Sequence, residues 1–350
     1  MKQVKIGLVG LGFMGSTHWG VYQGMKNAKV VALADVDAKK RKGDISAVVG
    51  NIGGGDNSKP LDLTGVTVYD DAFDMITDPD IDVVDICVPT PEHCDLVCAA
   101  LAVGKHVFCE KPLCGTPAEL KKIVAAVRKS KKFFNVGLCV RAWPEYRHAY
   151  EYFKSGKAGK MRSATFKRIS PSVDGNAWKN WFMDGAQSGG ALLDLHVHDV
   201  DEVNYFFGKP KSVTAFGAAD IVSKNGGVDH VVATYDYGDG SLVMAEGGWA
   251  AAKGTPFEMS FTIVCEKATI KLDASGYRIY PSKGGKPVSP KVDVKAGPTG
   301  WHQELAYFVD CVAKGVRPEK YQTIESVAQT MAIVFAEEKS AAAGGKRVKV

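Results

Sequence analysis

The first 140 residues alternate short apolar runs with segments whose apolar positions recur at helical spacing. The run Val4–Val9 is nearly continuous and rich in β-branched residues, which is typical of a strand buried on both faces. The strands expected in this part are Val4–Val9, Lys29–Ala34, Val66–Tyr69, Val83–Val88, His106–Cys109 and Phe133–Leu138. Strand–helix alternation at this spacing predicts parallel strands joined by right-handed crossovers, a doubly wound α/β domain.

The helices expected between these strands differ in how clearly they begin. The clearest start is at Thr116–Ser130, where Thr116 suits the N-cap and Pro117 the first helical position. The other helices are expected from the glycine-rich turn after Val9 to about Met25, from Asp70, and over Pro91–Ala102.

From about residue 160 strands follow one another with fewer helices between them. The expected strands are Met161–Ser170, Ser212–Ala218, Val228–Tyr237, Ser241–Trp249, Phe257–Cys265 and Ala268–Leu272. A Gly238-Asp-Gly240 break signals a hairpin, so a mostly antiparallel open sheet in an α+β domain is predicted. Helical periodicity returns over Gln303–Ala313 and Thr323–Ala343. Two domains follow, residues 1–140 and 141–350, with the C-terminal helix a candidate to pack back on the first.

Composition and charge exclude several classes of protein. The 44 basic and 39 acidic side chains are scattered along 350 residues, whereas nucleic-acid binding favours a clustered basic face. No apolar stretch approaches the roughly 18 residues of a membrane span, and the N-terminus has no signal-peptide core, so a cytoplasmic protein is expected. The eight cysteines include no C-x-x-C pair, which favours buried, reduced thiols over a zinc or redox site.

The strongest local motif is Gly10-Leu-Gly12-Phe-Met-Gly15, which follows a buried strand and opens a helix. The first glycine permits a tight turn, the second lets the backbone approach a pyrophosphate, and the third lets helix and strand pack closely. Asp35 ends the next strand, where a carboxylate accepts ribose hydroxyls and repels a 2′-phosphate. The motif predicts NAD binding by Gly10, Gly12, Phe13, Met14, Gly15 and Asp35. Three cations at 39–41 keep NADP open, and a turn that binds nothing is the alternative.

Two further segments end strands at the same edge of the predicted sheet. Thr90 and His93 follow the fourth strand, and Glu110 and Lys111 follow the fifth. Ligands of open parallel sheets bind beyond the carboxyl ends of the strands, so these four residues are candidates for the cofactor edge. The Lys111 ammonium would lower the pKa of a nearby hydroxyl or histidine. The alternative is an ordinary solvated lysine.

The segment Gly189–Asp201 holds an acid and two imidazoles at short spacing. If it is helical, Asp194 and His198 share one face, and the acid would orient a general base. If it is extended, Asp194, His196 and His198 share one face and resemble a metal site. The glycine pair and the apolar continuation favour a helix, and no metal is expected. Histidines satisfied within a core helix are the structural alternative.

These motifs in this order resemble the Gfo/Idh/MocA family, which includes glucose–fructose oxidoreductase, inositol dehydrogenase and the rhizopine catabolism protein. The resemblance rests on Gly10–Gly15, Glu110-Lys111-Pro112, Asp194 with His198, and the stretch from Phe308 to Pro318. It implies an NAD(P)-binding Rossmann domain and a second domain that binds substrate and forms oligomers. It also implies that Lys111 and His198 are catalytic, that Asp194 assists, and that the Lys111–Pro112 peptide is cis. Many relatives carry glycine at the position of His196.

The resemblance implies an NAD(P)-dependent oxidoreductase, a carbohydrate dehydrogenase that moves hydride between nicotinamide and a secondary alcohol or ketone. The substrate would be a sugar, glycoside or cyclitol, with His198 as base and Lys111 stabilising the oxyanion. The expected substrate wall at the domain junction is Arg141, Trp143, Tyr146, Trp178 and Trp181, with His196. The alternatives are a redox-neutral lyase, epimerase or glycosidase using tightly bound NAD, and a non-catalytic NAD-binding protein. A homodimer or homotetramer through the second-domain sheet is expected.

Overall fold

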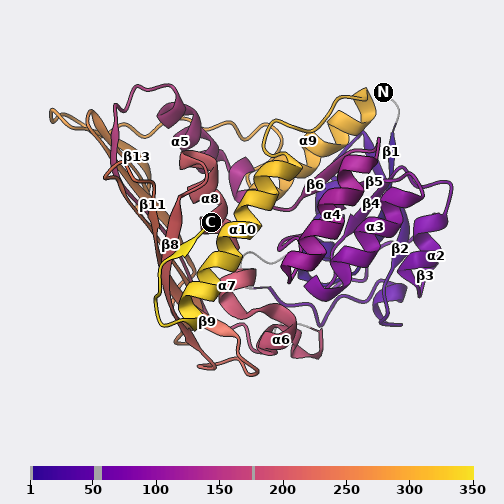
Figure 1. Ribbon diagram of the computed structural model, residues 1–350. Coiled ribbons are helices and arrows are strands. Elements are labelled where there is room, and N and C mark those ends of the chain that lie inside the picture. Colours follow the sequence, from indigo (N-terminus) through magenta and orange to yellow (C-terminus); the bar gives the residue numbers. More distant parts are fainter. Residues whose placement is uncertain (1–2, 51–56, 176–177) are drawn as a thin grey trace. The chain divides into compact units, whose positions relative to one another are not determined.

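Two separate sheets organise the chain in the computed structural model, which describes residues 3–50, 57–175 and 178–350 (Figure 1). The first unit contains Met1–Leu138, Gly175–Trp181 and Trp301–Val327. The second contains Cys139–Asp174, Phe182–Gly300 and Ala328–Val350. The stretch expected as one continuous second domain is therefore interrupted twice by segments that belong to the first unit.

The first unit is built on a six-stranded, wholly parallel sheet. Its strands are β1 (Val4–Val9), β2 (Ala28–Ala34), β3 (Thr67–Tyr69), β4 (Val83–Ile86), β5 (His106–Cys109) and β6 (Phe134–Val136). Their order, β3-β2-β1-β4-β5-β6, is that of dinucleotide-binding sheets. From β1 the chain adds β2 and β3 on one side, and from β4 it adds β5 and β6 on the other, so the strand order reverses between β1 and β4. Ligands of such sheets bind at this switch point, beyond the carboxyl ends of the strands.

Helices and short 3₁₀ turns connect these strands. They are α1 (Phe13–Gln23), a turn at Lys40–Lys42, α2 (Ala72–Thr77), a turn at Thr90–Glu92, α3 (His93–Ala102) and α4 (Pro117–Lys129). Helices α3 and α4 lie side by side over the sheet (Figure 1). A late helix, α9 (Gly300–Lys314), adds Leu305, Phe308 and Val309 to the core around β1. The apolar face of α9 is thus buried by the first unit.

The second unit holds an eight-stranded sheet of order β13-β12-β11-β7-β10-β9-β8-β14. Its strands are β7 (Met161–Pro171), β8 (Ser212–Ala219), β9 (Val228–Asp236), β10 (Leu242–Ala251), β11 (Glu258–Cys265), β12 (Ala268–Asp273), β13 (Gly276–Pro281) and β14 (Val348–Lys349). Among these eight strands, β7 and β10 pair in parallel and all other neighbours pair antiparallel. The predicted fold class, a parallel α/β domain followed by a mostly antiparallel sheet domain, is confirmed.

The helices of the second unit lie along one face of its sheet (Figure 1). They are α5 (Pro144–Lys154), α6 (Gly185–Ser188), α7 (Gly190–Asp194), α8 (Val197–Phe207) and most of α10 (Ile324–Ala342). A short 3₁₀ segment covers Cys139–Ala142, and another, Trp178–Met183, begins in the first unit and ends in the second. Burial alternates along β7, where Ala164, Phe166 and Arg168 face inward. The single helix expected after Gly189 is in fact two, α7 and α8, separated by a turn. All eight cysteines are free thiols, and across the described ranges no helix is long and apolar enough to cross a membrane.

Candidate functional site

The glycine turn between β1 and α1 has the shape that a pyrophosphate requires. Gly10 has a φ of 87°, and a Cβ there would lie 2.5 Å from the Cys87 carbonyl oxygen. A Cβ on Gly15 would collide with the Gly10 carbonyl oxygen, which explains why helix and strand can approach so closely. At Gly12, the N-cap of α1, no described atom lies within 4 Å of the added Cβ. The open backbone at the start of a helix fits a phosphate ligand.

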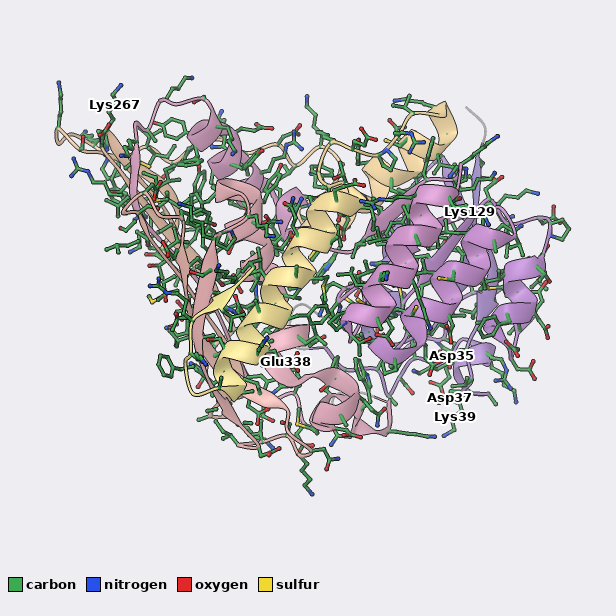
Figure 2. All side chains as sticks on the ribbon, in the orientation of Figure 1. Asp35, Asp37, Lys39, Lys129, Lys267 and Glu338 are labelled. Atoms are coloured by element: carbon green, nitrogen blue, oxygen red, sulfur yellow. The ribbon has the colours of Figure 1, made fainter. Side chains whose placement is uncertain are left out.

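Asp35 stands at the end of β2 and holds this turn. One carboxylate oxygen accepts the Leu11 N–H at 2.7 Å, and the other accepts the Asp37 N–H at 2.8 Å. A carboxylate has about four acceptor sites, so capacity for ribose hydroxyls remains. Nearby, the Arg41 guanidinium donates to the backbone carbonyls of Asp35 and Val36 at 2.8 and 3.0 Å. Figure 2 shows Asp35, Asp37 and Lys39 together at one edge of the first unit, with Lys129 at the opposite edge.

His93 links two loops instead of presenting its ring nitrogens to a cofactor. Its Nδ1 lies 2.9 Å from the Pro112 carbonyl oxygen and its Nε2 lies 2.9 Å from the Val88 carbonyl oxygen. Burial lowers the pKa of His93, so the ring is neutral and donates to one carbonyl at a time. This arrangement favours a positioning role for the His93 ring, and the cofactor contact predicted for it stays a prediction. Thr90, also predicted at this edge, is buried at the start of its 3₁₀ turn, and the Lys111–Pro112 peptide is cis.

Glu110 points into the first unit and not toward the cofactor edge. Its Oε2 accepts the N–H of Lys111 at 3.2 Å, and its Oε1 lies 3.2 Å from Nε2 of His18. The other ring nitrogen of His18 lies 2.8 Å from Asp85 Oδ2, which also accepts the Tyr22 hydroxyl at 2.8 Å. The direct cofactor contact predicted for Glu110 is therefore not supported. The sequence reasoning also missed the group behind it, although one carboxylate inside the apolar strand β4 was a usable signal.

The structure interrupts the helix that was expected to carry Asp194 and His198. Helix α7 ends at Asp194, the N–H groups of Leu195 and His196 both donate to the Ala191 carbonyl, and α8 starts at Val197. The extended alternative, with its metal-site geometry, is wrong because the segment is helical on both sides of the turn. Asp194 and His198 are both buried, at 9% and 8% exposure. Their predicted roles as base and helper stay predictions.

His196 is a core residue of the second unit. Its ring is fully buried, its Nε2 lies 3.2 Å from Oε2 of Glu337 on α10, and a Cβ on Gly247 of β10 would be 2.6 Å from its Nδ1. The imidazole therefore fills a space left by a glycine and pairs with a buried acid. The substrate contact predicted for His196 has no support in this arrangement.

Two more members of the predicted substrate wall are core residues. Arg141 forms a bidentate ion pair with Asp201, with nitrogen–oxygen distances of 2.6 and 2.5 Å, and its guanidinium stacks 4.6 Å over the Tyr205 ring. Tyr146 is fully buried, with its ring 4.8 Å from that of Phe261. These contacts favour structural roles for both residues, and the substrate contact predicted for them stays a prediction. Trp143 and Trp181 are half-buried and remain candidates, whereas the side chain of Trp178 lies outside the described part.

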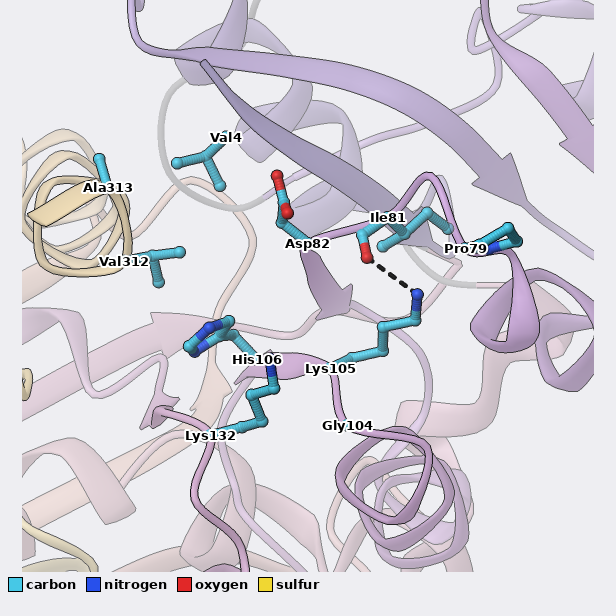
Figure 3. A pocket seen from close by; sticks show the side chains of 10 residues that line it. All are labelled: Val4, Pro79, Ile81, Asp82, Gly104, Lys105, His106, Lys132, Val312 and Ala313. Atoms are coloured by element: carbon cyan, nitrogen blue, oxygen red, sulfur yellow. Dashed lines mark hydrogen bonds between the residues drawn. The ribbon is translucent and has the colours of Figure 1, made fainter. Parts of the chain in front are cut away.

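A cavity of about 370 Å³ opens at the other end of the first sheet (Figure 3). It is lined at the starts of β1, β4 and β5 by Val4, Ile81, Asp82, Lys105 and His106, among others. The Lys105 ammonium donates to the carbonyls of Asp78 and Ile81, at 2.5 and 2.9 Å. Burial lowers the pKa of this lysine. The cavity therefore lies at the amino ends of the strands, opposite the edge where ligands of such sheets bind.

Comparison with known proteins follows the same division of the chain. Residues 4–138 match the family model described as "Oxidoreductase family, NAD-binding Rossmann fold". Residues 146–271 match the model "GFO/IDH/MocA C-terminal domain". Residues 4–138 and 146–271 are thus matched by two models of one enzyme family.

Several curated proteins and solved structures are similar to this chain. Levoglucosan dehydrogenase of Pseudarthrobacter phenanthrenivorans is 31% identical over 221 residues, 61% of this chain and 54% of that protein. Myo-inositol 2-dehydrogenase of Thermotoga maritima is 26% identical over 259 residues, 72% of this chain and 70% of that protein. A levoglucosan dehydrogenase structure, in complex with NADH and levoglucosan, superposes with a TM-score of 0.83 over the whole of both chains at 23% identity. The structural likeness extends across both units.

Proposed function

Since this chain belongs to the Gfo/Idh/MocA family of NAD-binding oxidoreductases, we propose that it transfers hydride between NAD and a secondary alcohol of a cyclitol or sugar. The observation that carries the proposal is the glycine turn. Its backbone leaves space over Gly12 at the start of α1, while any side chain at Gly15 would collide with the turn itself. Similar proteins are named for levoglucosan and myo-inositol, which points to a ring-shaped polyol.

Three residues of the chain carry the proposed chemistry. His198 takes the proton of the substrate hydroxyl on its imidazole, as a general base does. Asp194, four positions earlier, orients that imidazole or binds a second hydroxyl. The Lys111 ammonium donates a hydrogen bond to the substrate oxygen and stabilises the negative charge that develops there.

Bound NAD supplies the hydride acceptor, and the residues proposed to hold it are those of the carboxyl edge. The N–H groups at the start of α1 would face its phosphates, and the free acceptor sites of Asp35 would take ribose hydroxyls. The Arg41 guanidinium donates hydrogen bonds to backbone carbonyls and is not directed past Asp35. This arrangement favours NAD over NADP as the cofactor.

A substrate panel tests this proposal. The purified chain is incubated with NAD⁺ or NADP⁺ and with myo-inositol, scyllo-inositol, levoglucosan, glucose or xylose, while the absorbance of reduced nicotinamide is followed. We expect reduction of NAD⁺ with at least one member and its loss in Lys111→Met. The matched control is Lys129→Met, which changes an exposed lysine at the end of α4.

The redox-neutral alternative gives a different outcome in the same panel. A substrate would then be converted, as seen by chromatography, while no reduced cofactor accumulates. A chain that binds NADH but converts nothing would support the non-catalytic alternative. The cytoplasmic location and the homo-oligomer built through the second sheet stay predictions, and sedimentation measures the second.

A further inference from the structure

A chain of buried polar groups connects the core of the first unit to Lys111. It starts at Asp85 of β4 and passes through the His18 ring on α1 to Glu110 at the end of β5. The Oε2 of Glu110 then accepts the backbone N–H of Lys111 at 3.2 Å. The side chains of Asp85, His18 and Glu110 are all buried, and His18 and Asp85 have no exposed surface.

Two acidic side chains lie beside the His18 ring and favour its protonated form. Its Nδ1 is at hydrogen-bond distance, 2.8 Å, from Asp85, and its Nε2 lies 3.2 Å from Oε1 of Glu110, an ion-pair contact that is not aligned as a hydrogen bond. Burial alone would lower the pKa of His18, but the neighbouring Cys87 and Asp85 raise it well above its usual value. Burial also raises the pKa of the Cys87 thiol.

Two other groups complete the surroundings of the imidazolium. The Tyr22 hydroxyl donates to the same Asp85 oxygen at 2.8 Å, and burial keeps it un-ionised by raising its pKa. Glu304 of α9 is also buried, and burial and the charge of Glu110 raise its pKa well above the usual value. Asp85 and Glu110 are the acidic side chains whose oxygens lie next to the ring nitrogens of His18.

The Glu110 carboxylate has little room to move. A Cβ placed on Gly137, the residue that follows β6, would collide with Oε1 of Glu110. The carboxylate is thus enclosed between the Gly137 backbone on one side and the His18 ring on the other. If it were released from the ring, it would lose the contact that keeps Oε2 aimed at the Lys111 N–H.

We propose that His18 is a positioning residue for Lys111, acting through Glu110. The imidazolium anchors the Glu110 carboxylate, and that carboxylate fixes the backbone from which the Lys111 side chain projects. The inference rests on the proposed function only in giving Lys111 a catalytic role; the mechanical link itself is independent of the reaction.

His18, Asp85 and Cys87 lie close enough together to be considered as metal ligands. Here they contact one another directly: Nδ1 of His18 lies 2.8 Å from Asp85 and 3.3 Å from the Cys87 sulfur, the separations of hydrogen-bonded groups.

Two substitutions of His18 separate anchoring from simple charge balance. In His18→Gln the amide nitrogen reaches the place of Nε2 and can still donate to Glu110. In His18→Asn it reaches the place of Nδ1 and can donate only to Asp85. Both variants lose both ion-pair contacts of His18 and can keep one neutral hydrogen bond each, so we expect similar losses of thermal stability. Tyr22→Phe is the matched control. It removes the hydroxyl that donates a hydrogen bond to Asp85 and leaves the contacts of Glu110 unchanged.

Hydrogen exchange at the Lys111 amide gives a readout that needs no substrate. We expect slow exchange in the wild type, His18→Gln and Tyr22→Phe, and exchange faster by about tenfold or more in His18→Asn. With a substrate from the panel, kcat should fall roughly 10- to 100-fold in His18→Asn and stay within about threefold in His18→Gln, with KM little changed. If His18→Asn does not fold, Gly137→Ala displaces the same carboxylate and should give the same pattern.

The result that overturns the inference is equally specific. It is wrong if His18→Asn, or Gly137→Ala in its place, shows the Lys111 exchange rate of the Tyr22→Phe control. It is also wrong if that exchange rises while kcat stays at the wild-type value, or if His18→Gln and His18→Asn lose activity equally. Absence of turnover in the wild type would instead contradict the proposed function, and the exchange result would still stand.

Discussion

The buried pair of Arg141 and Asp201 offers the sharpest test of the second unit. Arg141 and Asp201 are 2% and 1% exposed, and two nitrogen–oxygen contacts of 2.6 and 2.5 Å join them. Substitution of Arg141 by Met keeps an aliphatic side chain but removes the charge and the guanidinium that lies over the Tyr205 ring. Asp201 would then keep only the Thr330 hydroxyl, at 2.7 Å, as a donor from the other helix.

The size of the effect follows from the buried Asp201 side chain, which is left without its arginine partner. Breaking a buried ion pair on one side costs about 3–5 kcal/mol because the remaining charge is uncompensated. A whole domain is stable by about 5–15 kcal/mol, so Arg141→Met should remove a large share of the stability of the second unit. Asp201→Asn in the same chain removes that charge, so the double variant should be less unstable than the sum of the single variants.

Denaturant titration of the four proteins in this cycle measures the coupling energy directly. We expect at least about 2 kcal/mol of coupling between Arg141 and Asp201, with KM for the best panel substrate unchanged in the folded fraction. A loss below about 1 kcal/mol in Arg141→Met, together with a raised KM, would refute the structural role. That pair of results would restore Arg141 to the substrate wall.

Three further predictions concern the first unit. Gly12→Ala should weaken NADH binding, measured by fluorescence, by about tenfold or more without lowering the melting temperature. Gly15→Ala should lower both the affinity for NADH and the melting temperature, because its Cβ would collide with the turn. Equal melting temperatures of the two variants would contradict the reasoning. Because burial raises the pKa of Glu304, the folded state binds its proton more tightly and loses stability as pH rises above the usual carboxyl range. Glu304→Gln should therefore be increasingly stabilising between pH 5 and about 8, and parallel stability curves would exclude this. Thr116→Ala should cost about 1 kcal/mol in urea denaturation by removing the capping bond to Glu119, with Thr116→Ser as a control that keeps it; no difference between the two would count against the cap.

The parts of the fold that could be predicted from the sequence are those with a local cause. The strand His106–Cys109 has the bounds that its apolar run indicated. The N-cap at Thr116 is confirmed, because its hydroxyl accepts the Glu119 N–H within four residues. Helix α5 was missed although its signal was present, since Tyr146, Ala149 and Phe153 recur at helical spacing after Pro144.

The parts that could not be predicted depend on partners far away in the sequence. An arginine such as Arg141 has the same local pattern whether it faces a substrate or a buried acid, and Asp201 lies 60 residues further on. His196 pairs with Glu337 from a helix near the C-terminus. The break between α7 and α8 depends on the Ala191 carbonyl accepting two N–H groups, which periodicity alone does not reveal.

Partners far apart in the sequence also decide the surroundings of Lys111, at the carboxyl edge of the first sheet. Its place after β5 followed from strand–helix alternation, and the resemblance pointed to its neighbours. The ring of His18 and the Asp85 carboxylate that stand behind Glu110 come from α1 and β4, 67 residues apart. Only the folded chain shows that these groups meet, and their meeting is the basis of the support that we propose for the lysine.

One measurement tests the central claim most directly: the rate at which NAD⁺ is reduced in the presence of myo-inositol, scyllo-inositol or levoglucosan. We expect reduced nicotinamide to accumulate with at least one of these alcohols, and the rate to fall about 100-fold or more in Lys111→Met. Lys129→Met should retain the wild-type rate. Full activity in Lys111→Met, or no reduction with any cyclitol or sugar by a chain that binds NADH, would contradict the account.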